Sequence, residues 1–242
     1  MLEINGVSKT YNRGRIKAVD GVTLSINDGE IFGFLGPNGA GKTTMIKMIT
    51  GILNPDQGSI KVKGIDITQN PREAKMQLGF VPDDPNIFPR LTGIEYLNFM
   101  ADIYEVDASA RLKRIPELLE RFQMSSAAKD LIQSYSHGMK QKILVIGAIL
   151  HNPPVWILDE PMTGLDPRSS FDLKEMMREH AAAGKTVFFS THVLEVAEKV
   201  CDRLAIINKG QVIFCGSMQE IHEHARENRS LENLFLELTE NA

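Results

Sequence analysis

The chain carries the run Gly36-Pro37-Asn38-Gly39-Ala40-Gly41-Lys42-Thr43. This run matches the pattern G-x-x-x-x-G-K-[ST] in every fixed position. The apolar segment 30–35 before it is typical of a buried parallel strand, and the segment 44–50 after it has the composition of a helix. A strand, a glycine-rich loop and a helix in this order predict a loop that surrounds phosphate groups.

The residue types in this loop suit a nucleotide. Glycines allow successive backbone N–H groups to point at one anion, and the positive end of the following helix adds a fixed partial charge. We expect Lys42 to reach the β- and γ-phosphates and the Thr43 hydroxyl to ligate Mg²⁺. Thr44, at the start of the predicted helix, is counted with the phosphate-binding residues.

Length and composition limit the class of protein. With 242 residues, the chain is long enough for one large domain or two small ones. The formal net charge is −4 and no basic tract occurs, which disfavours a nucleic-acid partner. No apolar run approaches the length of a membrane span, and the first residues lack the apolar core of a secretory signal. We therefore expect neither a transmembrane segment nor a signal peptide.

Alternating strand and helix patterns predict an α/β fold with a P-loop NTPase core, in which helices flank a mixed, mainly parallel sheet. Segments 2–7 and 18–26 alternate in polarity and predict an N-terminal antiparallel β-layer, with a hairpin-type turn at 27–29. Three predicted helices, 93–104, 108–122 and 137–150, form an inserted helical subdomain. We divide this single domain into a core (1–83 and 151–216), the helical subdomain (84–150) and a C-terminal helical tail (217–242).

An acidic pair follows a later apolar strand. Segment 155–158 is apolar throughout, and Asp159 and Glu160 come directly after it. Hydrolysis of a phosphate ester needs a metal ligand and a group that orients water. We expect Asp159 to hold Mg²⁺ through water and Glu160 to polarise the attacking water.

Further motifs occur in the order found in the nucleotide-binding subunits of ABC transporters. They are an early aromatic residue, a signature segment, an acidic pair with proline, a following loop and a late histidine: Tyr11, 134–142, Asp159-Glu160-Pro161, Thr163-Gly164-Leu165-Asp166 and Ser190-Thr191-His192. On these motifs and the phosphate loop, the chain resembles that family from Met1 nearly to its end.

The resemblance implies an ATPase that uses ATP and Mg²⁺, with Lys42, Glu160 and His192 as catalytic residues. It implies that Tyr11 stacks on the adenine. Ser136 and Gly138 would meet the γ-phosphate held by a second chain, either another copy or a paralogous subunit. Two ATP molecules would then clamp two chains head to tail, and hydrolysis would reopen them.

Two motifs depart from the family pattern. The signature is usually Leu-Ser-Gly-Gly-Gln, whereas this chain has Tyr135-Ser136-His137-Gly138-Met139. Any side chain at position 137 must point away from the nucleotide, so we expect His137→Gly to be tolerated. Asp83 stands where the family usually has glutamine. We count Asp83 with the nucleotide-binding residues, although the role of a glutamine does not transfer to it intact.

The form Tyr-Ser-x-Gly-Met-x-Gln-Lys and the tail 230–239 resemble the exporter branch for drugs, antibiotic peptides, lipids or polysaccharides. That branch implies a separate multi-span membrane permease and a place on the cytoplasmic face of the cell membrane. Residues 83–100 would pass motion to the permease, although we expect Phe88, Tyr96 and Phe99 to pack in the core. An importer subunit is the alternative. A soluble ABC ATPase would normally carry a long coiled-coil insertion or a second cassette, and this chain has neither.

Overall fold

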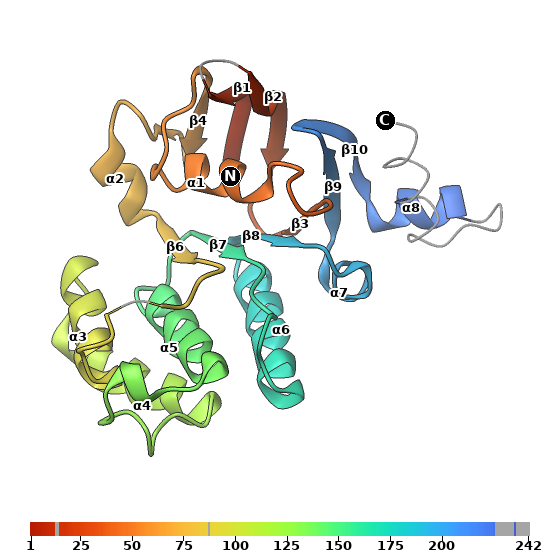
Figure 1. Cartoon of the computed structure of the whole chain (residues 1–242). Helices are drawn as coiled ribbons and strands as arrows, with labels where there is room; N and C mark the ends of the chain where they lie inside the picture. The colour runs from red at the N-terminus through yellow and green to blue at the C-terminus, as the bar shows by residue number, and fades with distance from the viewer. Residues whose placement is uncertain (13–14, 87, 226–234, 236–242) are drawn as a thin grey trace.

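Two β-sheets form the frame of the computed structural model, which describes residues 1–12, 15–86, 88–225 and 235 (Figure 1). Within these residues, one sheet is antiparallel with the strand order β2-β1-β4-β5, and the other has the order β10-β9-β3-β8-β7-β6. Strands β9 to β6 run parallel, and β10 is antiparallel to β9. The predicted α/β class with an N-terminal antiparallel layer is confirmed.

The first sheet consists of β1 (Leu2–Tyr11), β2 (Ile16–Ile26), β4 (Gln57–Val62) and β5 (Ile65–Asp66). The second consists of β3 (Ile31–Leu35), β6 (Leu78–Val81), β7 (Val155–Asp159), β8 (Thr186–Thr191), β9 (Arg203–Asn208) and β10 (Gln211–Ser217).

Both faces of the larger sheet are buried, which explains why its strands read as continuous apolar runs. In β7, Val155 and Ile157 join the cluster that includes the antiparallel layer, while Trp156 and Leu158 face the opposite cluster of helices. Helix α1 (Lys42–Ile49) contributes buried side chains to the first of these clusters. The phosphate loop is therefore anchored on both sides, by β3 and by a buried helix.

Helices cover the face of the larger sheet that lies opposite the antiparallel layer. Most of the chain between β6 and β7 is also helical. That segment contains α3 (Gly93–Ile103), α4 (Ala108–Arg121), the 3₁₀ turn η1 (Ile132–Ser134) and α5 (His137–Ile149). It lies to one side of the larger sheet in Figure 1. The remaining helices are α2 (Pro71–Met76), α6 (Pro167–Ala182), α7 (Leu194–Val200) and α8 (Met218–Ala225). Polar N-caps fix the starts of α3, α4, α5 and α6: Thr92, Asp107, Ser136 and Asp166.

The turn at 27–29 does not form the predicted hairpin. It joins β2 of the antiparallel sheet to β3 of the larger sheet, so the two flanking strands do not pair with each other. Instead, β3 pairs in parallel with β8 and β9. The turn chemistry was recognised correctly, but the partner of β3 lies more than a hundred residues away in the chain.

The expectation for the three aromatic residues holds for one of them. Tyr96 is buried, because Gly147 of α5 leaves room for its ring. Phe88 and Phe99 are 43% and 40% exposed, so the prediction of core packing is wrong for both. Their ring centroids lie 5.3 Å apart, and Phe88 also lies 5.7 Å from Tyr96. The result is an aromatic cluster on the surface of the helical segment.

The tail is described only in part. Helix α8 begins with a capping box in which the Ser217 N–H donates to the Glu220 carboxylate and the Glu220 N–H donates to the Ser217 hydroxyl. Apart from residue 235, the predicted tail motif at 230–239 lies outside the described residues. Among the helices of the described segments, none is both long and apolar enough to cross a membrane.

Candidate active site

The phosphate loop connects β3 to α1 as the sequence predicts. Gly41 occupies the N-cap position of α1 with φ +112°, and a β-carbon added to it would overlap the carbonyl oxygen of Ala18. A side chain there would be strained and would collide with β2. Gly36 is equally confined, because a β-carbon would meet the carbonyl of Ile207. Two glycines of the pattern are thus required by close backbone approach.

The side chain of Lys42 folds back into the phosphate loop. Its ammonium donates hydrogen bonds to the carbonyls of Gly36, at 2.6 Å, and Pro37, at 3.2 Å. The side chain is only 7% exposed. A buried lysine requires partners of this kind, and the carbonyls hold its positive charge at the centre of the loop.

A pocket of about 210 Å³ opens over the loop. The lining residues come from β2, the loop, α1 and the ends of two strands: Ala18, Pro37, Asn38, Gly39, Gly41, Lys42, Thr43, Thr44, Asp83 and Glu160. Of the remaining loop residues, Gly36 supplies a carbonyl to Lys42, and Ala40 is buried beneath. The sequence analysis missed Ala18, because nothing in an alternating strand marks one alanine as lining a pocket in another layer.

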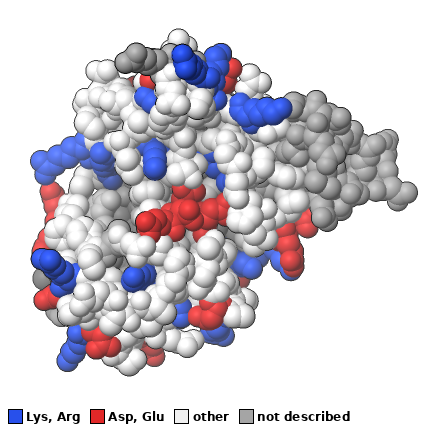
Figure 2. Space-filling view, viewed as in Figure 1, with Lys and Arg blue, Asp and Glu red and all other residues white. Residues whose placement is uncertain are grey.

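Acidic side chains gather in the middle of the face shown in Figure 2, between the sheets and the helical segment. Among the pocket-lining residues, Asp83 and Glu160 are negative and Lys42 is positive. A polyphosphate that enters this pocket therefore needs a cation of its own to offset the carboxylates.

Asp159 ends β7 and is almost fully buried, with 2% exposure. Burial raises the pKa of its carboxyl, as do the charges of Asp83 and Glu160, while hydrogen bonds from Ser190 and Thr43 oppose the rise. The Ser190 hydroxyl donates to Asp159 at 2.5 Å and accepts the backbone N–H of Glu160 at 3.1 Å. Ser190 thus orients both acids of the pair, a role that the sequence motif did not indicate.

Glu160 points back toward the phosphate loop. Its backbone adopts φ +46°, a left-handed conformation that is uncommon for a residue with a side chain. Its Oε1 lies 3.7 Å from the ammonium of Lys42 and 3.0 Å from Nδ1 of His192. The fold therefore brings together three predicted catalytic residues that are distant in the sequence.

The donor set beside the loop fits Mg²⁺ carried by a nucleotide. The Thr43 side chain interacts with Asp159 and lowers the pKa of that carboxyl, so one hydroxyl and one carboxylate lie together at the edge of the pocket. In the described parts of the chain, no cluster of three or more His, Cys, Asp or Glu side chains could hold a metal unaided. Mg²⁺ keeps several waters and binds through one or two protein groups together with substrate phosphates, which suits this set.

Besides Gly36, Ala40, Asp159 and His192, which lie beside the pocket-lining residues, three more predicted site residues are absent from the lining. Tyr11 ends β1 and is 40% exposed. Ser136 is the N-cap of α5, where its hydroxyl accepts the N–H of Met139 at 3.2 Å, and Gly138 lies in the first turn of that helix. The N-terminus of α5 therefore lies outside the lining of the phosphate pocket.

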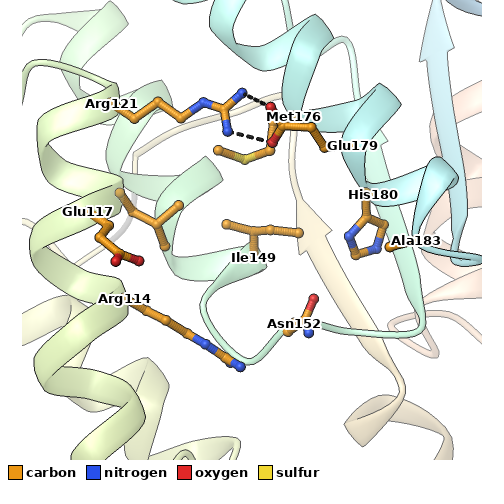
Figure 3. Close-up of a pocket in the computed structure, with 10 residues that line it drawn as sticks. Arg114, Glu117, Arg121, Ile149, Asn152, Met176, Glu179, His180 and Ala183 are labelled. Atoms are coloured by element: carbon orange, nitrogen blue, oxygen red, sulfur yellow. Dashed lines mark hydrogen bonds and ion pairs between the residues drawn. The ribbon is translucent and has the colours of Figure 1, made fainter.

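A second pocket, of about 380 Å³, lies between α4 and α6 (Figure 3). An ion pair spans it, with Arg121 donating to both carboxylate oxygens of Glu179 at 2.6 and 2.9 Å. The lining also includes Arg114 and Glu117, so charges of both signs are present in equal number. The charges select no class of ligand, and we treat this pocket as a seam between the helical segment and the core.

Comparison with known proteins identifies the family of the chain. Residues 19–163 match the family described as ABC transporter. A relative from Nostoc sp., named "Uncharacterized ABC transporter ATP-binding protein all4389", is 39% identical over 88% of this chain, which spans 65% of that protein. The linearmycin resistance ATP-binding protein LnrL of Bacillus subtilis is 38% identical over 91% of this chain and 70% of its own length.

Solved structures show the same fold. One titled "Structure of ATP binding subunit of ABC transporter" superposes with a TM-score of 0.93 at 33% identity and covers 98% of this chain and 99% of its own. A second, "Dimeric Structure of MJ0796, a Bacterial ABC Transporter Cassette", gives a TM-score of 0.82 at 26% identity, with 90% of this chain and 99% of its own covered.

Proposed function

The chain belongs to the ABC transporter family as an ATP-binding protein, and on that premise we propose that it hydrolyses ATP to drive a transporter. The observation that carries the proposal is the position of Glu160, 3.7 Å from the ammonium of Lys42 and 3.0 Å from His192. A phosphate-binding lysine and a carboxylate that line one pocket, with an imidazole against the same carboxylate, are the groups that phosphoryl transfer to water requires.

The phosphate loop binds the triphosphate. Lys42 turns from the carbonyls of Gly36 and Pro37 toward the β- and γ-phosphates, and the N–H groups at the start of α1 add the positive end of the helix. Thr43, and Asp159 through water, would hold the Mg²⁺ that arrives with the nucleotide. Bound Mg²⁺ offsets the charge that develops on the phosphate oxygens.

Glu160 acts on the attacking water. Its carboxylate takes a proton as the water oxygen bonds to the γ-phosphorus, and the bond from phosphorus to the bridging oxygen breaks to leave ADP. A positioned general base typically accelerates such a step by about 10² to 10⁴. His192, on the same carboxylate oxygen, fixes the orientation of Glu160.

The assembly is a dimer that shares two nucleotides. Ser136 and Gly138 lie outside the pocket of their own chain, which suits a role in completing the pocket of a second chain. The dimeric form of the MJ0796 cassette supports this arrangement. The second chain is another copy or a paralogous subunit, and Tyr11 stacks on the adenine at the edge of the pocket.

The membrane partner is a separate multi-span permease, and the chain works on the cytoplasmic face of the membrane. The exposed cluster of Phe88 and Phe99 offers an apolar docking point on the helical segment. Export is favoured over import, because the relative LnrL is named for resistance to linearmycin.

Phosphate release from Mg·ATP tests the enzymatic part of this proposal. We expect turnover that disappears when Mg²⁺ is chelated. Retrieval of the tagged chain from detergent-solubilised membranes tests the transporter part, and a multi-span protein should accompany it. Retrieval with ribosomes or DNA-repair proteins instead would assign the ATPase to a soluble process.

A further inference from the structure

The imidazole of His137 lies directly against Gly164. A β-carbon added to Gly164 would overlap its Cδ2 and lie 2.9 Å from its Nε2. Gly164 has φ +75°, so its backbone already favours glycine. The ring therefore occupies the space that the missing side chain at position 164 leaves open, and His137 contacts its own chain there.

This contact is one of several that join α5 to the loop 161–166, and Gly138 also approaches the Gly164 carbonyl closely. Gln141, which is 1% exposed, donates its Nε2 to the carbonyl of Pro161 at 3.4 Å. Lys142 forms an ion pair of 2.8 Å with Asp166, the N-cap of α6. His137 meets the middle of the loop, between these two polar contacts. One face of α5 thus holds the loop at its beginning, middle and end.

The loop 161–166 directly follows Glu160, the residue proposed to activate water. Pro161 is bonded to Glu160, and the N–H of Thr163 donates to the Glu160 carbonyl at 3.1 Å. The left-handed backbone of Glu160 persists only while its surroundings hold it. A shift of the loop would therefore rotate Glu160 away from Lys42 and His192.

We propose that His137 is a positioning residue for Glu160: its ring, packed on Gly164, holds the loop 161–166 in the path that aims the carboxylate at the phosphate pocket. This inference rests on the proposed ATPase activity. Because His137 directly follows Ser136, a nucleotide of the second chain that engages the start of α5 would act on the same loop. The ring of His137 thereby couples nucleotide binding in the second chain's site to the orientation of Glu160 in its own chain.

Replacement by glycine tests the role of the ring. The sequence alone predicts that His137→Gly is tolerated, whereas the contact with Gly164 predicts a kcat about fivefold lower, since small misplacements of a catalytic group are costly. Binding of a fluorescent ATP analogue should not change. His137→Phe restores a flat ring and should return kcat to within about twofold of the wild type.

Ala108→Gly is the matched control. Ala108 is the first residue of α4, as His137 is of α5, and it is exposed, so this variant reproduces the cost of glycine in a first helical turn without touching the loop. It should keep wild-type kcat. Equal kcat for His137→Gly and wild type, or equal losses in His137→Gly and His137→Phe, would overturn the proposal.

Hydrogen exchange of the full chain separates this inference from the proposed function. In His137→Gly, amides of 162–166 should exchange at least about threefold faster than in the wild type, and Ala108→Gly should leave them unchanged. Unchanged exchange in the loop would refute the contact even in an active enzyme. A wild-type protein without turnover, with Lys42→Ala as the reference for background, would instead refute the ATPase proposal while the exchange result still reports on His137.

Discussion

The imidazole of His192 contacts the carboxylate of Glu160 at the centre of the site, with Nδ1 of His192 3.0 Å from Oε1 of Glu160. The backbone of Glu160 is left-handed there, and its N–H is held by Ser190. The carboxylate is therefore oriented from three sides, by its own strained backbone, by a neighbouring strand and by the imidazole. Such orientation is what a general base requires before water can be activated.

We predict that His192→Ala lowers turnover by about 10² while nucleotide binding persists, because the imidazole orients Glu160 and does not belong to the phosphate pocket. His192→Gln should recover part of the loss, since its amide can donate to the same oxygen. Initial rates of phosphate release, measured beside binding of a fluorescent ATP analogue, check both statements. A His192→Ala enzyme with wild-type rates would remove the imidazole from the mechanism.

Lys42→Ala should weaken nucleotide binding by about tenfold to a hundredfold, the usual worth of a hydrogen bond to a charged group. The loss arises because Asp83 and Glu160 would then face the phosphates without the lysine. Lys47→Ala is the control, since Lys47 lies in the last turn of the same helix and is exposed. Titration calorimetry with Mg·ATP compares the two variants. Equal affinities would show that the cradle around Lys42 does not bind phosphate.

The sequence predicts the parts of the site that are encoded by adjacent residues. The loop from Gly36 to Thr43 and the pair Asp159-Glu160 carry their chemistry within a few positions, so their pattern is sufficient. Ala18 and the role of Ser190 were not predicted, because Ser190 reaches Asp159 through the pairing of β7 with β8, and Ala18 reaches the pocket through the packing of β2 on the phosphate loop. A local pattern contains no information about such a neighbour.

The same limit applies to the fold. Burial on both faces makes the strands of the larger sheet easy to recognise. The turn at 27–29, however, does not indicate that the strand after it, β3, belongs to a different sheet from the strand before it, β2. Phe88 and Phe99 show the converse limit, because an aromatic residue in or beside a helix is predicted to lie in the core until the surrounding helices are placed. Roles that depend on a second chain, such as that of Ser136, need an assembly to test them.

Acid should weaken the fold through His180. Burial lowers the pKa of its imidazole to about 4, with a contribution from the positive charge of Lys185. The unfolded state, with a pKa near 6.5, therefore binds the proton first, and stability falls as the pH drops from about 6.5 to about 4, by up to about 1.4 kcal/mol per pH unit. His180→Phe keeps a ring against Trp156 but cannot titrate. Denaturant unfolding at several pH values should give a shallower decline for this variant, and parallel curves would contradict the assignment.

The ion pair across the second pocket should matter little for stability (Figure 3). Glu179 is 60% exposed in its side chain, so Glu179→Gln should cost less than about 1 kcal/mol despite the two short hydrogen bonds to Arg121. Phe188→Ala should cost about 3 to 5 kcal/mol, because that ring is fully buried beside two other rings. Urea unfolding compares them directly. A Glu179→Gln loss as large as that of Phe188→Ala would mean that the pair holds the helical segment on the core.

Glu160→Gln should separate binding from hydrolysis. Glutamine has nearly the shape of glutamate, but its amide cannot take a proton from water, so turnover should fall by about 10² to 10⁴. The neutral amide also removes a negative charge beside the γ-phosphate, so binding of Mg·ATP should persist or tighten. We therefore expect the variant to accumulate as a dimer at saturating Mg·ATP, while the wild type returns to monomer as ATP is consumed. Size-exclusion chromatography with nucleotide in the running buffer measures this difference.

A second substitution tests which surface forms the dimer. Ser136 caps α5 at a position outside its own pocket, so arginine there should block the γ-phosphate of the opposing chain. The double variant Glu160→Gln with Ser136→Arg should remain monomeric and still bind one nucleotide per chain, because Lys42 and its loop are untouched. Ser126→Arg in the same background is the control, since Ser126 is exposed in the helical segment and lies in a turn outside α5. A dimer that survives Ser136→Arg but not Ser126→Arg would place the shared-nucleotide interface on residues other than the start of α5, and the two-site mechanism would have to be rebuilt around them.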